Sequence, residues 1–268
     1  GKKELYTGAD APWTIQCGRA NKCSYQASTR DIYPDIFANW TERNPPTPTN
    51  PHATADAYLQ SGRGFDVVKW QGSYSQEVYK DYQSGFTCPT VRFNLTSNGQ
   101  TIGYWERLIE PAQGIAKAKV QTGFKFKGHA WLPPKLHLIQ GVWSYVKELW
   151  IVEGIFDAMA LTENGLHAIS NITAGNFPAH TLAQIKARMD ELGKPQPKLI
   201  IALDSDTAGR KATDKLVAQA RQNGWDVAAA QSSEYGDGAD WNDLHKAGKL
   251  TKTDLGRYRF YGDLLIAD

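Results

Sequence analysis

From Leu149 onward, the chain alternates between short apolar runs and longer segments with helical periodicity. The apolar runs lie in LWIVEG, HAISNI, KLIIALDSD and DVAAAQ. The helical segments that follow them are IFDAMALTENG, AHTLAQIKARMDELG, TAGRKATDKLVAQARQNG and DWNDLHKAG, and each ends on Gly, the residue favoured just after a helix. Apolar strands that alternate with helices predict a parallel sheet covered by helices on both faces, and therefore an α/β fold.

Two of the apolar runs stop on acidic residues. Glu153 closes the first run, and Asp204 and Asp206 close the third. In an open parallel sheet the active crevice lies at the carboxyl ends of the strands, so these side chains should meet there. The spacing of Asp204 and Asp206 would point both to one side of an extended chain. Asp157, one helical turn after Glu153, and Asp240, at the head of the last helix, complete the set.

Carboxylates gathered at one rim repel one another unless a cation lies among them. Oxygen ligands without His or Cys favour Mg²⁺ or Mn²⁺, which commonly bridge to substrate phosphates. Local alternatives are open for single residues, because Asp204 and Asp240 could cap helices and Glu153 could pair with an arginine. A further alternative is a receiver-like or phosphatase sheet, in which a strand-end aspartate acts as a nucleophile.

Three neighbouring residues fit a ligand site. Gly154 and Gly209 would let the backbone approach a ligand closely. Arg210 lies at the start of a helix, where backbone amides can meet a phosphate.

The region before Leu149 divides by composition. Residues 41–54 contain four prolines and no apolar periodicity, which predicts an extended linker after residues 1–40. Residues 55–148 begin with a short helix in ADAYLQSGRGF, and Asn98-Gly99 between two alternating stretches predicts a tight hairpin. We expect residues 149–248 to form the parallel-sheet domain and residues 249–268 to begin a further element.

Charge is distributed unevenly along the chain. The formal net charge is only +2. Basic residues outnumber Glu106 and Glu110 in one segment, which contains Arg92, Arg107, Lys117, Lys119, Lys125, Lys127 and Lys135. A basic segment followed by acidic strand ends indicates a phosphate-rich partner and a cation, although a solvated surface would give the same pattern. Trp105, Trp131 and Trp143 lie in or near this segment and could stack on bases or belong to the core.

The motifs VEGIFDAM, ALDSDTAGRKA and GADWNDL resemble the TOPRIM domain of bacterial-type primases, type IA and type II topoisomerases and some nucleases. Its signature is a glutamate–glycine on the first strand and a DxD on the third, which Glu153, Asp204 and Asp206 match. The longer D-x-D-x-A-G-R form and the loop NITAGNFPAH are similar to those of primases.

The upstream sequence also resembles replicative primases of the bacterial type. YLQSGRG is similar to a Y-L-x-x-R-G element with one extra residue and supplies Arg63. VRFNLTSNGQTIGYWERLIE is similar to an R-x-x-F-P-I strand, a turn and G-x-x-x-x-x-R, without the proline, and supplies Arg92 and Arg107. KAKVQTGFKFKG stands where the family has a lysine-rich segment, which implies phosphate contacts by Lys117, Lys119 and Lys127.

Residues 1–40 resemble part of the zinc ribbon with which such primases begin. Cys17 and Cys23 match one knuckle with a loose spacing, and no partner pair precedes them. The resemblance therefore implies a chain cut from a longer protein inside its ribbon, with Zn²⁺ bound only by the full-length protein.

The resemblance implies the catalytic core of a DNA primase, a DNA-directed RNA polymerase that makes short RNA primers on single-stranded DNA. Glu153, Asp204 and Asp206, supported by Asp157 and Asp240, would hold two Mg²⁺ or Mn²⁺ ions. Its other partners would be ribonucleoside triphosphates and a replicative helicase, fused or separate. The departures from the family pattern are similar to versions in phages, plasmids and other mobile elements.

Two other functions are compatible with the motifs. One is a TOPRIM nuclease or topoisomerase, and the other is a replication factor that binds single-stranded DNA. The three cysteines are too few for a disulfide framework, which predicts a reducing compartment, here the cytoplasm of a bacterial host. The sequence contains neither an apolar run long enough to span a membrane nor a signal peptide, so no membrane partner is expected.

Overall fold

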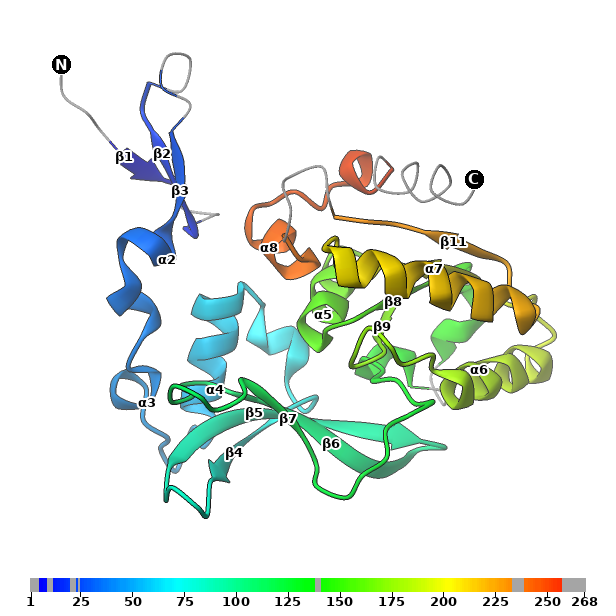
Figure 1. The fold of residues 1–268 in the computed structure, drawn as a ribbon, viewed down its shortest axis with the longest axis horizontal. Coiled ribbons are helices and arrows are strands. Elements are labelled where there is room, and N and C mark those ends of the chain that lie inside the picture. Colours follow the sequence, from blue (N-terminus) through cyan, green and yellow to red (C-terminus); the bar gives the residue numbers. More distant parts are fainter. Residues whose placement is uncertain are drawn as a thin grey trace.

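The computed structural model describes residues 5–8, 12–19, 23, 25–137, 141–232 and 239–256. These residues form three sheets with helices between and around them (Figure 1). The predicted start of a further element in residues 249–268 lies partly outside the described residues. Among the described residues, no helix is long and apolar enough to cross a membrane.

The parallel sheet predicted after Leu149 is confirmed. Its strands are parallel in the order β11-β10-β8-β9, with β8 at Glu148–Val152, β9 at Ala168–Ser170, β10 at Lys198–Ile201 and β11 at Val227–Ala229. The helices that alternate with them are α5 (Ile155–Glu163), α6 (Ala179–Glu191), α7 (Thr207–Gln222) and α8 (Trp241–Lys246). The crossover order places β8 and β10 side by side in the middle of the sheet.

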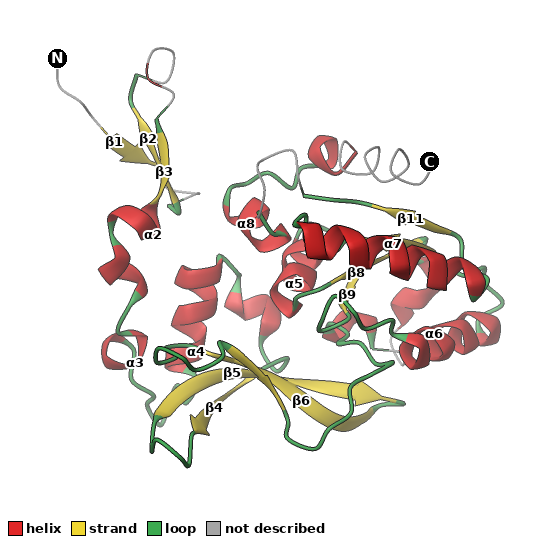
Figure 2. Ribbon diagram, viewed as in Figure 1, coloured by secondary structure: helices red, strands yellow, loops and turns green. Residues whose placement is uncertain are grey.

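The strand residues divide between two cores because successive side chains point to opposite faces. Trp150 and Ile200 pack with α5 and α8 in one core, whereas Ile151 and Ile201 pack with α6 and α7 in the other. Figure 2 shows these helices around the sheet. Burial on both faces explains why the strands are apolar without alternation.

A second sheet of four antiparallel strands packs below the first in the view of Figure 1. Its strands are β4 (Ser75–Lys80), β5 (Thr87–Ser97), β6 (Gln100–Leu108) and β7 (Ala118–Val120). The predicted hairpin is confirmed, since Asn98 and Gly99 join β5 to β6 with φ values of 49° and 75°. These positive values match a type I′ turn.

The third sheet is antiparallel, projects at the N-terminal end and contains β1 (Leu5–Thr7), β2 (Thr14–Cys17) and β3 (Gln26–Ser28). In the described part of the chain, six short helices follow this sheet: α2 (Thr29–Ile32), η1 (Pro34–Phe37), α3 (Trp40–Arg43), α4 (Ala53–Ala57), η2 (Tyr58–Gly62) and η3 (Val67–Trp70). Two more, η4 (Pro134–Leu136) and η5 (Gly141–Tyr145), lie between β7 and β8. The predicted extended linker is therefore wrong at its ends, which lie in α3 and α4, and Thr54 is fully buried.

The second sheet and the parallel sheet share one hydrophobic core. Phe156, at the start of α5, lies at ring-centroid distances of 6.0 Å from Phe93 on β5 and 5.8 Å from Trp105 on β6. Trp131 and Trp143 are buried as well, so the core interpretation of these two tryptophans is confirmed. The two regions are therefore packed against each other through aromatic rings.

Candidate active site

The predicted carboxylates lie at the ends of two neighbouring strands and at the starts of three helices. Glu153 directly follows β8, and Asp204 lies between β10 and α7. Residues Ile151 and Ile201 pair in register, so the two strand ends lie side by side. Asp157 is in the first turn of α5, and its Oδ1 accepts a hydrogen bond from the Asn242 amide on α8 at 3.0 Å.

The two remaining aspartates are helix caps. Asp206 caps α7 by accepting from the Gly209 amide at 2.7 Å, and Asp240 caps α8 by accepting from the Asp243 amide at 2.6 Å. The capping alternative is thus confirmed for Asp240 and wrong for Asp204, because Asp206 takes that role. The expectation of an extended chain through both aspartates is also wrong, since the chain bends at Ser205 and Asp206.

The carboxyl groups lie close enough to influence one another's protonation. Burial raises the pKa of Asp204 to about 7, and the charges of Glu153, Asp240 and Asp206 add to the effect. Burial also raises the pKa of Asp157 well above its usual value, with further contributions from Asp240 and Asp204. The acidic residues that lie far apart in the sequence therefore converge at one site.

Glu153 and Asp240 complete this electrostatic pattern. Burial raises the pKa of Glu153, and the charge of Asp206 adds to that effect, although the backbone amide of Ala174 donates a hydrogen bond that lowers it. Burial likewise raises the pKa of Asp240, with a further contribution from Asp243. A cation beside these groups would lower the free energy of their ionised forms and so lower their pKa values.

The donor set fits a hard divalent cation. All five predicted ligands are carboxylates, which are preferred by Mg²⁺ and Mn²⁺. Within the described residues, no group of three or more His, Cys, Asp and Glu side chains is placed so that it could already hold a metal ion. Mg²⁺ commonly uses one or two carboxylates together with waters and substrate phosphates.

We expect the metal-free protein to lose stability as the pH rises between about 4 and about 7. The usual pKa of Asp204 is 3.8, and burial raises it to about 7 in the folded protein. Folded protein then binds a proton that the unfolded chain has released, so this contribution is fully present below pH 3.8 and is lost as the pH rises through about 7. Melting temperatures in chelator, measured for wild type and Asp204→Asn, test this; parallel curves would contradict the raised pKa.

Two glycines, Gly154 and Gly209, allow segments of the site to pack very close to one another. A Cβ at Gly154 would lie 2.5 Å from Oδ2 of Asp157, and a Cβ at Gly209 would overlap the carbonyl oxygen of Asp204. The site's own carboxylate-bearing segments therefore lie close to both glycines. The close approach of a ligand to them stays a prediction.

A half-buried cluster of two arginines, Arg63 and Arg107, borders the carboxylates. Nε and Nη2 of Arg63 donate to the hydroxyl of Tyr58 at 3.0 and 2.9 Å. Burial acts to raise the pKa of Tyr58, but the charges of Arg63 and Arg107 outweigh it and lower that pKa. Burial acts to lower the pKa of Arg63, yet Tyr58, Asp240 and Asp157 hold it above its usual value. Two predicted phosphate-binding arginines therefore share one phenol beside the acidic site.

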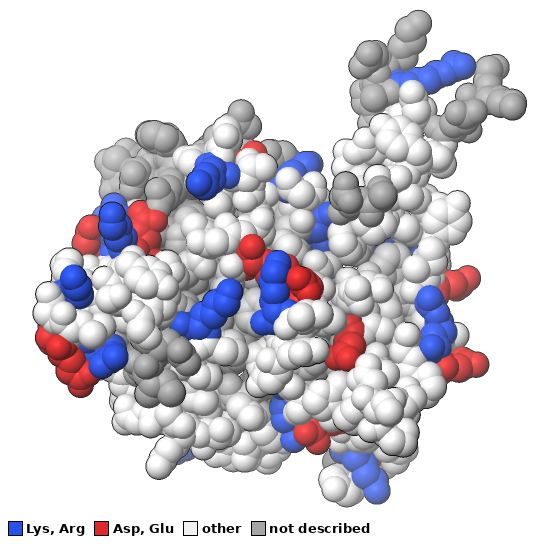
Figure 3. All heavy atoms as spheres, turned by 180° about the vertical axis from the view of Figure 1, so that it is seen from behind, with Lys and Arg blue, Asp and Glu red and all other residues white. Residues whose placement is uncertain are grey.

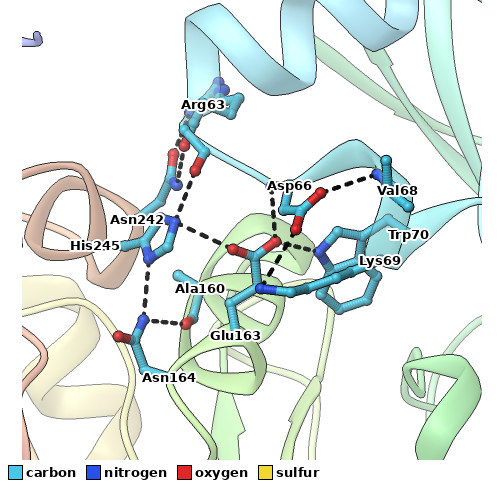
Figure 4. Close-up of polar contacts among 11 residues, drawn as sticks. Arg63, Asp66, Val68, Lys69, Trp70, Ala160, Glu163, Asn164, Asn242 and His245 are labelled. Atoms are coloured by element: carbon cyan, nitrogen blue, oxygen red, sulfur yellow. Dashed lines mark hydrogen bonds and ion pairs between the residues drawn. The ribbon is translucent and has the colours of Figure 1, made fainter. Parts of the chain in front are cut away.

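Contacts in Figure 4 fix this cluster to the parallel-sheet region. Nη1 of Arg63 donates to Oδ1 of Asn242 at 3.3 Å, and Nδ2 of Asn242 donates to the Arg63 carbonyl at 2.9 Å. Nearby, Glu163 on α5 accepts hydrogen bonds from the Asp66 amide at 3.0 Å and from Nε1 of Trp70 at 2.6 Å. The segment that carries Arg63 is thus held against α5 and α8.

The other predicted basic residues do not join this cluster. Arg92 forms an ion pair of 2.8 Å with the buried Glu106, and its guanidinium lies 3.7 Å from the ring centroid of Tyr104. Lys119 lies over the ring of Tyr79 at 5.1 Å. The rest, all exposed, are Lys117, Lys127 and Arg210. Figure 3 shows basic and acidic side chains next to one another near the centre of one face.

The predicted zinc half-site stays a prediction. Cys17 is buried at the end of β2, whereas Cys23 is exposed, and among the described residues neither belongs to a group that could hold a metal. The projecting sheet contacts the rest of the chain through Trp13, whose Nε1 donates to the Ser61 carbonyl at 3.1 Å.

Three residues near the site were not predicted. Asn242 joins Asp157 to Arg63, and the motif GADWNDL contains it directly after Asp240-Trp241. Arg30, from the N-terminal segment, lies close enough to contribute to the lowered pKa of Arg107, for which burial is the main cause. The Ala174 amide reaches Glu153. Long-range packing brings Arg30 to the site, so no local pattern signals it, whereas Ala174 lies in the loop NITAGNFPAH that the sequence analysis noted.

Comparison with protein families identifies the parallel-sheet region. Residues 150–245 match the family model described as Toprim-like. A search of curated protein sequences gave no match. Residues 150–245 are therefore similar to Toprim-like domains.

Comparison with solved structures extends over most of the chain. The RNA polymerase domain of Mycobacterium tuberculosis primase DnaG aligns with a TM-score of 0.55 and 17% identity, over 88% of this chain and 84% of that one. The same domain in complex with double-stranded DNA gives 0.55 and 18%, over 86% and 79%. The Aquifex aeolicus primase, with zinc-binding and RNA polymerase domains, gives 0.53 and 15%, over 96% and 75%. The chain has the fold of these primase domains.

Proposed function

We propose that this chain is the catalytic core of a DNA primase, which copies single-stranded DNA into short RNA primers. The observation that carries the proposal is the convergence of Glu153 and Asp204 from neighbouring parallel strands, beside the half-buried pair Arg63 and Arg107. Carboxylates for a divalent cation and arginines for phosphates are the two components that nucleotidyl transfer needs.

Each group at the site has a role in this proposal. Glu153, Asp204 and Asp206, with Asp157 and Asp240 in support, would hold two Mg²⁺ or Mn²⁺ ions. When bound, the ions would activate a ribonucleotide 3′-hydroxyl and stabilise the leaving pyrophosphate. Glu153 has a raised pKa and could also accept the proton of that hydroxyl.

Arg63 and Arg107 would bind phosphates of the nucleoside triphosphate or of the template. Their shared partner Tyr58 keeps the two like charges in place, and partial burial reduces the screening of these charges by water. Lys117, Lys127 and Arg210 are exposed and would contact phosphates further from the reacting atoms. For Arg92 and Lys119, the pairing with Glu106 and Tyr79 favours a structural role, and a template contact would be additional.

The wider setting is part of the same proposal. The departures from the primase pattern, among them WNDL after Asp240, favour a primase of a phage, plasmid or other mobile element that acts in the bacterial cytoplasm. A replicative helicase, fused or separate, would be its partner.

The test is template-directed synthesis. The protein is incubated with varied single-stranded DNA templates, labelled ribonucleotides and Mg²⁺ or Mn²⁺, and the products are separated on a sequencing gel. We expect short products that depend on both template and metal ion. Cleaved template would instead indicate a Toprim nuclease, and DNA binding without product would indicate a replication factor; either result overturns the proposal.

Replacement of Arg107 by Ala should weaken single-stranded DNA binding and reduce its salt dependence. Each phosphate contact releases counterions, so one lost contact should lower the slope of log K against log salt by about 0.7. Fluorescence anisotropy of a labelled oligonucleotide, from about 50 to 200 mM salt, measures the slope. Arg221→Ala, in the exposed last turn of α7, is the matched control and should leave it unchanged. An unchanged slope in Arg107→Ala would contradict the phosphate contact.

A further inference from the structure

The loop after β9 contains the one β-branched residue with a positive φ among the described residues. Ile172 has a φ of 74°, a left-handed conformation that side chains branched at Cβ rarely adopt. Such a conformation persists only where the surrounding structure holds it, and it is typical of functional sites. The contacts that hold Ile172 therefore indicate what the loop does.

Ser170 holds the strained residue and contacts Glu153. Its hydroxyl accepts a hydrogen bond from the Ile172 amide at 3.0 Å and donates one to the Glu153 carbonyl at 2.7 Å. Two residues beyond Ile172, the backbone amide of Ala174 lies close enough to the Glu153 carboxylate to lower its pKa. The loop thus contacts the Glu153 backbone and approaches its side chain, and the left-handed turn lies between Ser170 and Ala174.

The side chain of Asn176 holds the C-terminal end of the loop by hydrogen bonds. Its Oδ1 accepts from the Gly128 amide at 2.8 Å, and its Nδ2 donates to the carbonyls of His129 at 2.8 Å and Asn171 at 2.7 Å. Ser170 also exchanges two backbone hydrogen bonds with Trp131, at 2.8 and 3.0 Å. The loop is therefore anchored to the chain segment that directly follows Lys127.

The loop is not arranged for stability alone. The side chain of Asn171 is fully buried, and neither its Oδ1 nor its Nδ2 has a hydrogen-bond partner in the structure. An unsatisfied buried amide and a strained Ile172 in the same loop are both unfavourable. Both unfavourable features next to Glu153 are explained if the loop must hold Glu153 in a fixed position.

We infer that residues 170–176 are a positioning element for Glu153, and that Ser170 is the positioning residue through which the strained turn sets the Glu153 carboxylate. This inference rests on the proposed role of Glu153 in holding a divalent cation. It adds residues that contact neither metal nor substrate and that act through Glu153, as hydrogen-bonding partners of metal ligands do in other proteins.

The test measures Mn²⁺ binding directly, by the electron paramagnetic resonance signal of free Mn²⁺. Loss of a group that orients a metal ligand commonly weakens binding 10–100-fold, so Ser170→Ala should weaken it about tenfold. Thr181→Val is the matched control. Thr181 is also buried and its hydroxyl holds the Ala130 amide at 2.9 Å, without contact to Glu153. It should change Mn²⁺ affinity by less than about twofold.

A double-mutant cycle with Ile172→Gly tests the strained turn. Glycine adopts a positive φ without strain, so the turn no longer needs the Ser170 hydroxyl. Ser170→Ala should then cost less than about threefold when it is added to the Ile172→Gly variant, against about tenfold in wild type. The lost packing of the Ile172 side chain is common to both arms and cancels. Equal costs in the two backgrounds would overturn the inference.

Glu153→Gln separates this inference from the proposed function. If Glu153→Gln weakens Mn²⁺ binding and Ser170→Ala does not, the positioning role is wrong and the metal site stands. If Glu153→Gln leaves Mn²⁺ binding unchanged, the role of Glu153 in metal binding is wrong, and the inference falls with it.

Discussion

Replacement of Asp204 by Asn should abolish primer synthesis, with a loss of at least about 10³-fold, equivalent to about 4 kcal/mol of transition-state stabilisation. The carboxylate of Asp204 lies where the charges of Glu153, Asp240 and Asp206 meet, so a neutral amide removes the group at the centre of the site. The same change should leave the fold at least as stable at neutral pH, because it removes a partly buried charge that its neighbours repel. The gel assay gives the activity, and thermal unfolding in chelator gives the stability.

Asp206 allows a matched pair of substitutions. Asn also caps helices, so Asp206→Asn should lose activity while the start of α7 stays intact. Asp206→Ala should lose activity as well as about 1 kcal/mol of folding free energy, because the cap is gone. Wild-type rates in either Asn variant would contradict the assignment of these aspartates to catalysis.

Replacement of Gly209 by Ala should damage both fold and activity. In an ordinary helix this change is stabilising by about 1 kcal/mol, since Gly has a low helix propensity. Here the new Cβ would overlap the carbonyl oxygen of Asp204, so α7 or the Asp204 segment must move. We expect the sign to reverse, with a destabilisation of about 2–3 kcal/mol, as for other overpacked sites, and loss of primer synthesis.

Urea unfolding and the gel assay measure the two effects of Gly209→Ala. Gly141→Ala is the control, because a Cβ at Gly141 meets no atom within 4 Å and its backbone has no positive φ. It should leave both unchanged. A stable, active Gly209→Ala protein would show that the close approach of α7 to Asp204 is not required.

Sequence patterns predicted the elements of the fold more fully than the geometry of the site. The apolar runs and C-terminal glycines predicted the parallel sheet, and Asn98-Gly99 predicted the hairpin, because each pattern acts through nearby residues. The end of β10 was not predictable, since LDSD suits both an extended strand and a helix cap. The structure ends the strand at Ile201 and gives Asp206 the cap.

The neighbours of the carboxylates depended on contacts between distant parts of the chain. The motif predicted that Arg63 is a functional residue. It could not predict the contact of Arg63 with Asn242, because the two residues are 179 positions apart in the sequence. Arg92 carries the same charge in a similar motif position, yet a cross-strand pair with Glu106 engages it. Spacing along the sequence does not distinguish these two arginines, whereas their burial and partners do.

Phe156 packs in the hydrophobic core and also lies next to the candidate active site. Its ring lies in the common core, 4.5 Å from the guanidinium of Arg63 and one residue before Asp157. A fragment cut at residue 149 would leave this ring and its aromatic partners exposed to water, which disfavours an independently folded Toprim-like piece. We therefore expect the carboxylates and the arginines to belong to one cooperative unit, in which the two halves of the site unfold together.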